Sequence, residues 1–312
     1  MPLTKGTLDN PNAGRIRRIA DLARAKTRRK TGRMLVEAPQ AVREAITFRP
    51  DLVEDLYVEI DEDGNTVSAR AAAIVADVLG RETRGEGTGQ DRIYVHYVTE
   101  RVMAAISTDA QGIAATAQTG DLGGDLDAWT LPTQTGDGGR RPLVAAFWQV
   151  RDPGNAGTVI RTADAAGADA VVFVDECVDP LGPKVVRSTA GSLYHIPVLR
   201  ASVDGFLDWN ARNGLHVVAA DVRGTEAMRP TSLADLIRRG DASAAAPAWA
   251  SDGAGASVLF GNEARGLDDD VLERCDGIVS IPIYGRAESL NLATSASVLL
   301  YSLAMSSHVR TM

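Results

Sequence analysis

Three short segments in the second half of the sequence combine glycine with amide, hydroxyl or charged side chains. They are residues 151–161 (RDPGNAGTVIR), 261–267 (GNEARGL) and 284–291 (YGRAESLN). Each follows an apolar stretch that is typical of a buried strand. Glycine lets a ligand approach the backbone closely, and the polar side chains can bind or orient it. One such segment is more often a turn with a helix cap, but three of them in one domain indicate a ligand site.

The elements around these segments predict a parallel α/β sheet. Strands are expected at 143–148, 170–174, 196–199, 216–220, 257–260 and 277–283, and helices at 158–166, 204–213, 233–239, 268–273 and 290–305. The first strand is a nearly continuous apolar run, as in strands that are covered on both faces. Repeated strand–helix units form sheets of this kind, and ligands bind at the carboxyl ends of their strands. The three polar segments are therefore expected to share one site.

The first 118 residues predict a separate, smaller α/β domain. Helices are expected at 16–25, 39–46 and 67–79, together with a short helix that ends at residue 106. Strands are expected at 34–37, 56–60, 94–98 and 113–117. Residues 119–141 are rich in Gly, Asp and Thr and show no periodicity, which predicts a linker. Residues 240–256, rich in Ala, Gly, Ser and Asp, are predicted to form a disordered surface insertion. The second domain then occupies residues 142–312.

Several common catalytic and nucleotide-binding motifs are absent from the sequence. No GxxxxGK[ST], HExxH or GxSxG pattern occurs. The nearest approach to GxGxxG, at Gly253-Ala-Gly255, precedes a strand and so cannot direct a helix N-terminus at a phosphate. The four histidines are scattered, and His96 and His216 fall inside expected strands, where a structural role is the more common one. No metal site is expected.

Composition indicates a soluble, cytoplasmic protein. Hydrophobic residues make up 45% of the chain and charged residues 24%, which is the usual balance of a globular protein. The two cysteines, Cys177 and Cys275, form no CxxC pair, in keeping with a reducing compartment. The N-terminus lacks the apolar region of a signal peptide, and no apolar run approaches the ~18 residues of a membrane span.

Positive charge is concentrated near the N-terminus, although the chain is acidic overall. Residues 15–33 contain nine basic residues and one acidic residue, a local charge of +8 in a chain of net charge −8. Such a cluster can bind RNA phosphates, or it can simply form a solvated helix. We predict that this cluster binds RNA phosphates. The residues assigned to it are Arg15, Arg17, Arg18, Arg24, Arg28, Arg29 and Lys30.

The three polar segments resemble the three motifs of the SpoU (TrmH-like) branch of the SPOUT RNA methyltransferases. The matching patterns are Asn155-x-Gly157-xxx-Arg161, Leu259-Phe-Gly261-Asn-Glu263-xx-Gly266-Leu267 and Ile281-Pro282-xx-Gly285-xxx-Ser289-Leu290-Asn291. Their order and spacing agree without departure, and the resemblance covers about residues 143–305. More weakly, the first domain resembles the L30e-like RNA-binding module, with residues 34–37 in the position of a similar strand.

The resemblance implies a parallel SPOUT sheet with a deep trefoil knot, a homodimer formed through the knot, and S-adenosylmethionine as cofactor. The reaction implied is methylation of a ribose 2′-hydroxyl, most simply in ribosomal (23S) RNA because an added RNA-binding domain suits folded rRNA. A tRNA substrate is the first alternative. The second alternative is a non-catalytic RNA-binding protein on the same scaffold. A protein that had lost its activity would lose the polar motif residues first, but these are all present.

The resemblance also assigns residues to the site. Those implied to surround the ribose are Arg161, Asn155, Glu263, Ser289 and Asn291. Those implied to hold the cofactor are Gly261, Ile281, Leu290, Phe260, Asn262 and Pro282. In the family, the residue matching Arg161 is held to activate the hydroxyl. Because arginine is effectively always protonated, we expect Arg161 to gather a neighbouring phosphate or stabilise alkoxide charge, with direct proton abstraction by Arg161 as the alternative. No metal is required.

Overall fold

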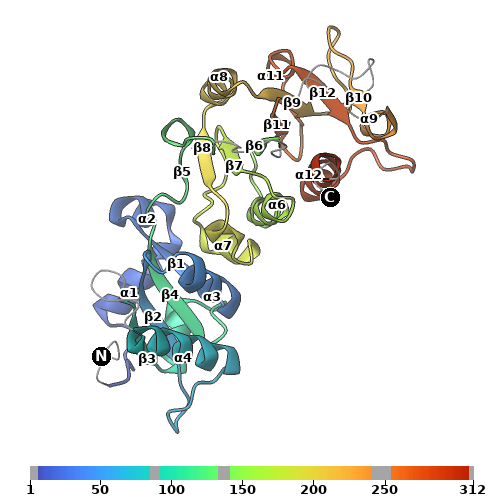
Figure 1. Ribbon diagram of the computed structural model, residues 1–312. Coiled ribbons are helices and arrows are strands. Elements are labelled where there is room, and N and C mark those ends of the chain that lie inside the picture. The colour runs from blue at the N-terminus through green and yellow to red at the C-terminus, as the bar shows by residue number, and fades with distance from the viewer. Residues whose placement is uncertain (1–5, 85–91, 133–140, 240–253, 309–312) are drawn as a thin grey trace. The chain divides into compact units, whose positions relative to one another are not determined.

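The computed structural model describes residues 6–84, 92–132, 141–239 and 254–308 (Figure 1). These residues form two compact units. The first unit takes the described residues up to Leu122 together with Asp179–His195, and the second takes those of Gly123–Val178 and those from Ile196 onward. The chain therefore passes between the units three times. No helix among the described residues is long and apolar enough to cross a membrane.

The first unit is built on a four-stranded sheet in the order β1-β4-β2-β3 (Figure 1). Its strands are β1 (Arg33–Glu37), β2 (Val53–Glu59), β3 (Tyr94–Val98) and β4 (Ile113–Gln118). Strand β4 runs antiparallel to both of its neighbours, while β2 and β3 are parallel. The helices of this unit are α1 (Gly14–Ala20), α2 (Ala25–Thr31), α3 (Pro39–Phe48), α4 (Ala69–Thr83), α5 (Glu100–Ile106) and α7 (Pro183–Ser188).

The basic segment forms two short helices in place of the single one predicted over 16–25. Helix α1 ends at Ala20, a 3₁₀ turn (Asp21–Ala23) follows, and α2 runs to Thr31. Gly32, in the left-handed region at φ +64°, ends α2. Ile16 and Ile19 are buried in the core of the unit, against Val102 and Ile106 of α5.

The second unit contains an eight-stranded parallel sheet in the order β10-β12-β9-β11-β6-β7-β8-β5. The strands are β5 (Gly124–Asp125), β6 (Leu143–Trp148), β7 (Ala170–Val174), β8 (Val198–Ala201), β9 (His216–Ala220), β10 (Thr231–Ser232), β11 (Ala256–Phe260) and β12 (Gly277–Ser280). Every residue of β6 and β7 is buried, which accounts for their unbroken apolar sequences.

Two motifs of the second unit lie in different elements from those that the sequence predicted, one because of a helix start and one because of a strand end. The helices of this unit are α6 (Pro153–Ala165), α8 (Val203–Asn213), α9 (Leu233–Arg239), α11 (Asp269–Leu272) and α12 (Leu292–His308). Helix α6 begins at Pro153 and not at residue 158, so the whole of the motif Asn155–Arg161 is helical. Strand β12 ends at Ser280, so Ile281 and Pro282 follow the strand instead of belonging to it.

Part of the predicted linker is built into the second unit. Gly124 pairs with Leu199 across β5 and β8, and Leu126 is only 1% exposed. The ring of Trp129 stacks on that of Trp209, with centroids 5.6 Å apart. The apolar residues scattered among Gly, Asp and Thr thus serve as packing residues. Residues 133–140, and residues 240–253 of the predicted insertion, lie outside the described residues.

Residues 179–195 lie between β7 and β8 in sequence but pack in the first unit. Asp179 pairs with Arg28 of α2, and Arg187 of α7 pairs with Glu37 of β1. The His195 ring contacts that of Phe48, with centroids 4.2 Å apart. A fragment that starts at residue 142 therefore carries a segment whose packing partners have been removed.

Truncation before β5 or after it is expected to give fragments of different stability. Fragment 123–312 keeps Leu126 and Trp129, whereas fragment 142–312 loses both. Burial of a leucine side chain contributes about 1.5–3 kcal/mol, so fragment 123–312 is expected to melt about 5 °C higher, at roughly 2–4 °C per kcal/mol. Both fragments expose residues 179–195 equally, which makes them a matched pair. Equal melting temperatures by circular dichroism would show that residues 123–132 are only a connection.

Candidate active site

The first motif lies in the opening turns of α6. Asp152 caps this helix, since its Oδ1 accepts a hydrogen bond from the backbone N–H of Asn155 at 2.7 Å. Pro153 takes the first helical position, where a missing N–H is tolerated. Asn155 therefore lies in the first helical turn, a short distance along the chain from the carboxyl end of β6. Arg161 lies further along the same helix and is exposed.

The second motif forms a loop that closes on itself after β11. The backbones of Asn262 and Gly266 exchange two hydrogen bonds, at 3.1 and 2.9 Å, and Gly266 is left-handed at φ +74°. A Cβ atom on Gly261 would lie 2.6 Å from the backbone nitrogen of Leu267. Gly261 is thus required by the loop itself. A larger residue there would disrupt the loop whether or not a ligand binds beside it.

The third motif is an exposed stretch of chain between β12 and α12. Asn291 caps α12, because its Oδ1 accepts a hydrogen bond from the backbone N–H of Ala293 at 2.9 Å. Ser289 is exposed. Within the part of the chain that the structure describes, residues 282–290 make no backbone–backbone hydrogen bond. Since backbone groups are strong donors and acceptors, those of this stretch remain open to solvent or a ligand.

One residue from each motif joins a continuous chain of hydrogen bonds. Asn155 donates from Nδ2 to Glu263 Oε1 at 3.3 Å. Asn291 donates from Nδ2 to Asn155 Oδ1 at 3.2 Å. Asn155 is therefore held on both sides, by the loop after β11 and by the cap of α12. The structure brings together these three of the five residues predicted to surround the ribose.

Arg161 and Ser289 are not joined to this trio by a hydrogen bond. Both side chains are exposed. Among the described residues, none forms a hydrogen bond or ion pair with the Arg161 guanidinium. An exposed arginine without an acidic partner is available to an anionic substrate.

Phe260 belongs to the core of the second unit. It is 1% exposed, and its ring stacks on Phe147 with centroids 5.1 Å apart and an interplanar angle of 13°. Its side chain is occupied within the protein, so only its backbone can contribute to a cofactor site. The other residues predicted to hold the cofactor are partly or fully exposed: Gly261, Asn262, Ile281, Pro282 and Leu290.

Sequence reasoning missed two polar residues that contact the second motif. The backbone carbonyl of Gln149 accepts a hydrogen bond from Asn262 Nδ2 at 2.7 Å. Arg265 donates a hydrogen bond to the Gln149 side chain and lies over the ring of Trp148, 5.4 Å from its centroid. Arg265 stands at an unassigned position of the motif, and could have been suspected there. Nothing in residue type or spacing marks Gln149.

A metal site or a reactive thiol near these loops would place particular requirements on the residues there. In the ranges that the structure describes, no three His, Cys, Asp or Glu side chains are grouped as a metal site would need. Burial raises the pKa of Cys177 to about 11. Because the thiolate is the reactive form, this cysteine is not an activated nucleophile.

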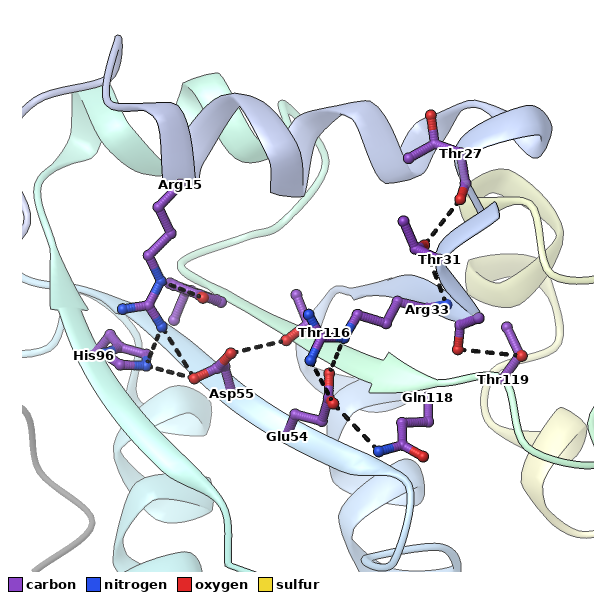
Figure 2. Close-up of polar contacts among 12 residues, drawn as sticks. Arg15, Thr27, Thr31, Arg33, Glu54, Asp55, His96, Thr116, Gln118 and Thr119 are labelled. Atoms are coloured by element: carbon purple, nitrogen blue, oxygen red, sulfur yellow. Dashed lines mark hydrogen bonds and ion pairs between the residues drawn. The ribbon is translucent and has the colours of Figure 1, made fainter. Parts of the chain in front are cut away.

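Arg15 is held by polar residues of the small sheet (Figure 2). Its Nη2 lies 3.0 Å from Asp55 Oδ1 and 2.6 Å from His96 Nε2, and its Nε donates to the Tyr57 hydroxyl at 3.2 Å. Burial alone would raise the pKa of Asp55, but the hydrogen bond with His96 and the charge of Arg15 outweigh it and lower that pKa. Arg15 is thus paired inside the unit, but its side chain is 39% exposed, and its contact with RNA phosphate stays a prediction.

The burial of Arg28 contradicts its predicted contact with RNA phosphate. Its side chain is 4% exposed, and its Nη2 lies 2.6 Å from Asp179 Oδ2. Its Nη1 donates to the backbone carbonyls of Leu22 and Ala23 at 2.7 and 2.8 Å. Arg28 therefore joins α2 to the preceding turn and to residues 179–195, and it cannot reach an RNA phosphate. The remaining residues of the predicted RNA surface are exposed: Arg17, Arg18, Arg24, Arg29 and Lys30.

Arg28→Ala is expected to lower the free energy of unfolding by about 3–5 kcal/mol, because removing one partner of a buried ion pair leaves the other uncompensated. Arg29→Ala changes an exposed neighbour on the same helix and is expected to stay within about 0.5 kcal/mol of wild type. Urea unfolding of the full-length chain, followed by circular dichroism, measures both variants. Equal stabilities would contradict the structural role of Arg28.

Comparison with known proteins places this site in a family. Residues 142–301 match the SpoU rRNA Methylase family. The chain is 30% identical over 280 residues to the 23S rRNA (guanosine(2553)-2′-O)-methyltransferase RlmP of Bacillus subtilis strain 168, an alignment that covers 89% of this chain and 91% of that protein. It is 36% identical over 160 residues, 51% of each chain, to the 23S rRNA (uridine(2479)-2′-O)-methyltransferase of Streptomyces viridochromogenes.

Solved structures extend the similarity to both units of the fold. The AdoMet-bound rRNA methyltransferase of Sinorhizobium meliloti superposes with a TM-score of 0.72 at 25% identity, covering 97% of this chain and 98% of that one. The predicted α/β architecture with a parallel SPOUT sheet is thereby confirmed. The family match includes all three motifs and confirms the resemblance drawn from them. The chain belongs to the SpoU rRNA methylase family.

Proposed function

We propose that the protein is an S-adenosylmethionine-dependent RNA methyltransferase that methylates a ribose 2′-hydroxyl in 23S ribosomal RNA. The observation that carries this proposal is the hydrogen-bonded chain Glu263–Asn155–Asn291, with one residue from each SpoU motif. The similarity to RlmP over most of both chains supports the reaction and the choice of 23S rRNA.

The segments after β11 and β12 fit S-adenosylmethionine by the chemistry of their donors. The adenine, ribose and amino-acid groups of this cofactor need both hydrogen-bond donors and acceptors, which the backbone supplies. In the described chain, the backbone of residues 282–290 is not bonded to other backbone groups. Gly261, Ile281 and Leu290 would hold the adenosyl portion through their backbones. When bound, S-adenosylmethionine supplies a methyl group that its sulfonium charge already activates.

The polar trio and Arg161 take different parts in methyl transfer. The attacking ribose oxygen must be aligned, and the negative charge that develops on it must be stabilised. Asn155, held by Glu263 and Asn291, is fixed in orientation and positions the ribose. The guanidinium group of an arginine is a cation, so Arg161 attracts the adjacent phosphate and stabilises the charge on the 2′-oxygen. It acts as a charge stabiliser and not as a base, so the proton of the 2′-hydroxyl passes to solvent water.

The order of strands supports the predicted trefoil knot. Strand β12 lies beyond β9 in the sheet, yet α12, which follows β12, packs against α6, which follows β6. The hydroxyls of Thr162 and Ser297 lie 3.3 Å apart at this helix contact. The chain therefore returns past β9 and β11 after leaving β12. A knot formed by the C-terminal segment requires such a return.

An apolar stripe on α12 supports the predicted homodimer. Val298, Tyr301 and Met305 are 38%, 41% and 58% exposed, and their spacing of three and four residues puts them on one face of the helix. Contiguous apolar residues on a surface mark an interaction site. We infer that the partner is a second copy of the chain, with the active site near the interface. An rRNA substrate would place the dimer in the cytoplasm.

Deleting the gene is expected to remove one 2′-O-methyl mark from 23S rRNA, and the wild-type gene is expected to restore it. The Arg161→Ala gene should not, because loss of a charge-stabilising donor slows reactions by ~10²–10³. Calorimetric titration of the purified variant with S-adenosylhomocysteine should give wild-type affinity. The control is Arg274→Ala, which removes an exposed arginine paired with Asp204. Loss of a tRNA mark would favour the tRNA alternative, and full restoration by Arg161→Ala would exclude Arg161 from the mechanism.

The exposed basic residues of α1 and α2 are expected to contribute to RNA affinity through counterion release. Replacing Arg17, Arg29 and Lys30 with alanine should reduce the log–log salt slope of RNA binding by about two, at 0.7–0.9 per phosphate contact. A control triple removes exposed, acid-paired arginines of the second unit: Arg212, Arg238 and Arg274. Its slope should match wild type. If the basic variant also kept the wild-type slope, the basic side chains of α1 and α2 would make no phosphate contacts and would only be exposed to solvent.

A further inference from the structure

Gln149 adopts a backbone conformation that its residue type disfavours. It follows Trp148, the last residue of β6, and its φ is +52°. Left-handed backbone is uncommon outside glycine, asparagine and aspartate. Such conformations persist only where surrounding contacts enforce them, and they cluster at functional sites. The contacts of Gln149 therefore indicate what the conformation achieves.

These contacts direct two acceptors of Gln149 toward the loop of the second motif. Its backbone N–H donates to the carbonyl of Val174, at the end of β7, at 3.1 Å. Its own carbonyl accepts from Asn262 Nδ2 at 2.7 Å, and its side-chain Oε1 accepts from Arg265. Gln149 thus connects the carboxyl ends of two central strands to two residues of one exposed loop.

Arg265 is held from a second direction by Trp148. Its guanidinium lies over the indole ring, 5.4 Å from the centroid, a geometry that favours the cation electrostatically. The ring itself is fixed, since Trp148 is 2% exposed and its Nε1 donates to Asp175 Oδ2 at 2.7 Å. Asp175 also adopts a left-handed conformation, at φ +58°, after β7.

The loop is closed by the two backbone hydrogen bonds between Asn262 and Gly266, but few of its side chains are buried. Apart from buried Leu267, its residues are exposed or partly exposed. On its far side, Arg223 donates to the Leu267 carbonyl at 2.9 Å. The Gln149–Arg265 clamp, meaning these two side chains and the Gln149 carbonyl, connects Asn262 and Arg265 of this loop to the end of β6.

We propose that Gln149 and Arg265 are positioning residues for the cofactor and fix the loop 261–267 in its binding conformation. This inference rests on the proposed function, because the loop is the segment assigned to S-adenosylmethionine. Neither residue is required to touch the cofactor. Both act through Asn262 and the loop backbone, so their loss should weaken cofactor binding more than it slows methyl transfer.

Three variants of the full-length chain separate the parts of the clamp. Arg265→Ala removes the cation and is expected to weaken S-adenosylhomocysteine binding roughly 10-fold, from the loss of one hydrogen bond and one cation–ring contact. Gln149→Gly keeps the left-handed backbone and the carbonyl that Asn262 uses, so its effect should be smaller. Gln149→Val disfavours that backbone and removes the side-chain acceptor, so its effect should be the largest.

The readouts distinguish positioning from a purely structural role. Arg265→Ala should raise the KM for S-adenosylmethionine in step with Kd while kcat at saturation stays within roughly 3-fold. Arg265→Lys, which keeps a cation over Trp148, should recover part of the affinity. Arg274→Ala is the matched control and should bind as wild type does.

The expected ranking of lost affinity is Gln149→Val, then Arg265→Ala, then Gln149→Gly, and the melting temperatures of Arg265→Ala and Gln149→Gly should stay close to wild type. Wild-type affinity in both Gln149→Val and Arg265→Ala would overturn the inference. So would a loss that tracks a fall in melting temperature and is not recovered by Arg265→Lys. Failure of the wild-type protein itself to bind S-adenosylhomocysteine would overturn the proposed function, and the inference with it.

Discussion

The strands that carry the proposed active site all run in the same direction, and the arrangement of the proposed site depends on this. Strand β11 pairs in parallel with both β6 and β9, and β12 continues the same direction beyond β9. Segments that leave the carboxyl ends of these strands therefore emerge at one edge of the sheet. Asn155 and Glu263 become hydrogen-bonded neighbours although 108 positions separate them. Burial of the central strands β6 and β7 holds this edge together.

Much of the second unit could be predicted because its signals are local. Apolar runs marked the central strands, and polar segments after them marked the site. The start of α6 was missed because Asp-Pro-Gly is typical of a turn, whereas Asp152 is a helix cap and Pro153 the first helical residue. The left-handed Gln149 was missed for a different reason. Glycine or asparagine would have signalled that backbone, but glutamine carries no such preference.

The basic segment shows what a sum of charges cannot reveal. The sequence contains nine positive residues between 15 and 33, yet four of them have an acidic partner inside the first unit: Arg15, Arg24, Arg28 and Arg33. Arg15 meets Asp55, 40 positions away, and Arg28 meets Asp179, 151 positions away. A cation with a buried partner and a cation facing solvent look alike in sequence. Only the fold separates the arginines that stabilise the unit from those left for a ligand.

The packing of residues 179–195 in the first unit also has a consequence for synthesis of the chain. The four strands of that sheet are complete once residue 118 has been made, but Arg28 gains its acidic partner only with Asp179, and Glu37 gains Arg187 later still. At about 5–20 residues per second, the ribosome needs on the order of ten seconds to travel from residue 122 to residue 195. During that interval the N-terminal sheet exists with a cation and a carboxylate not yet neutralised. The first unit can therefore complete its packing only after residues 179–195, which lie between β7 and β8, have been translated.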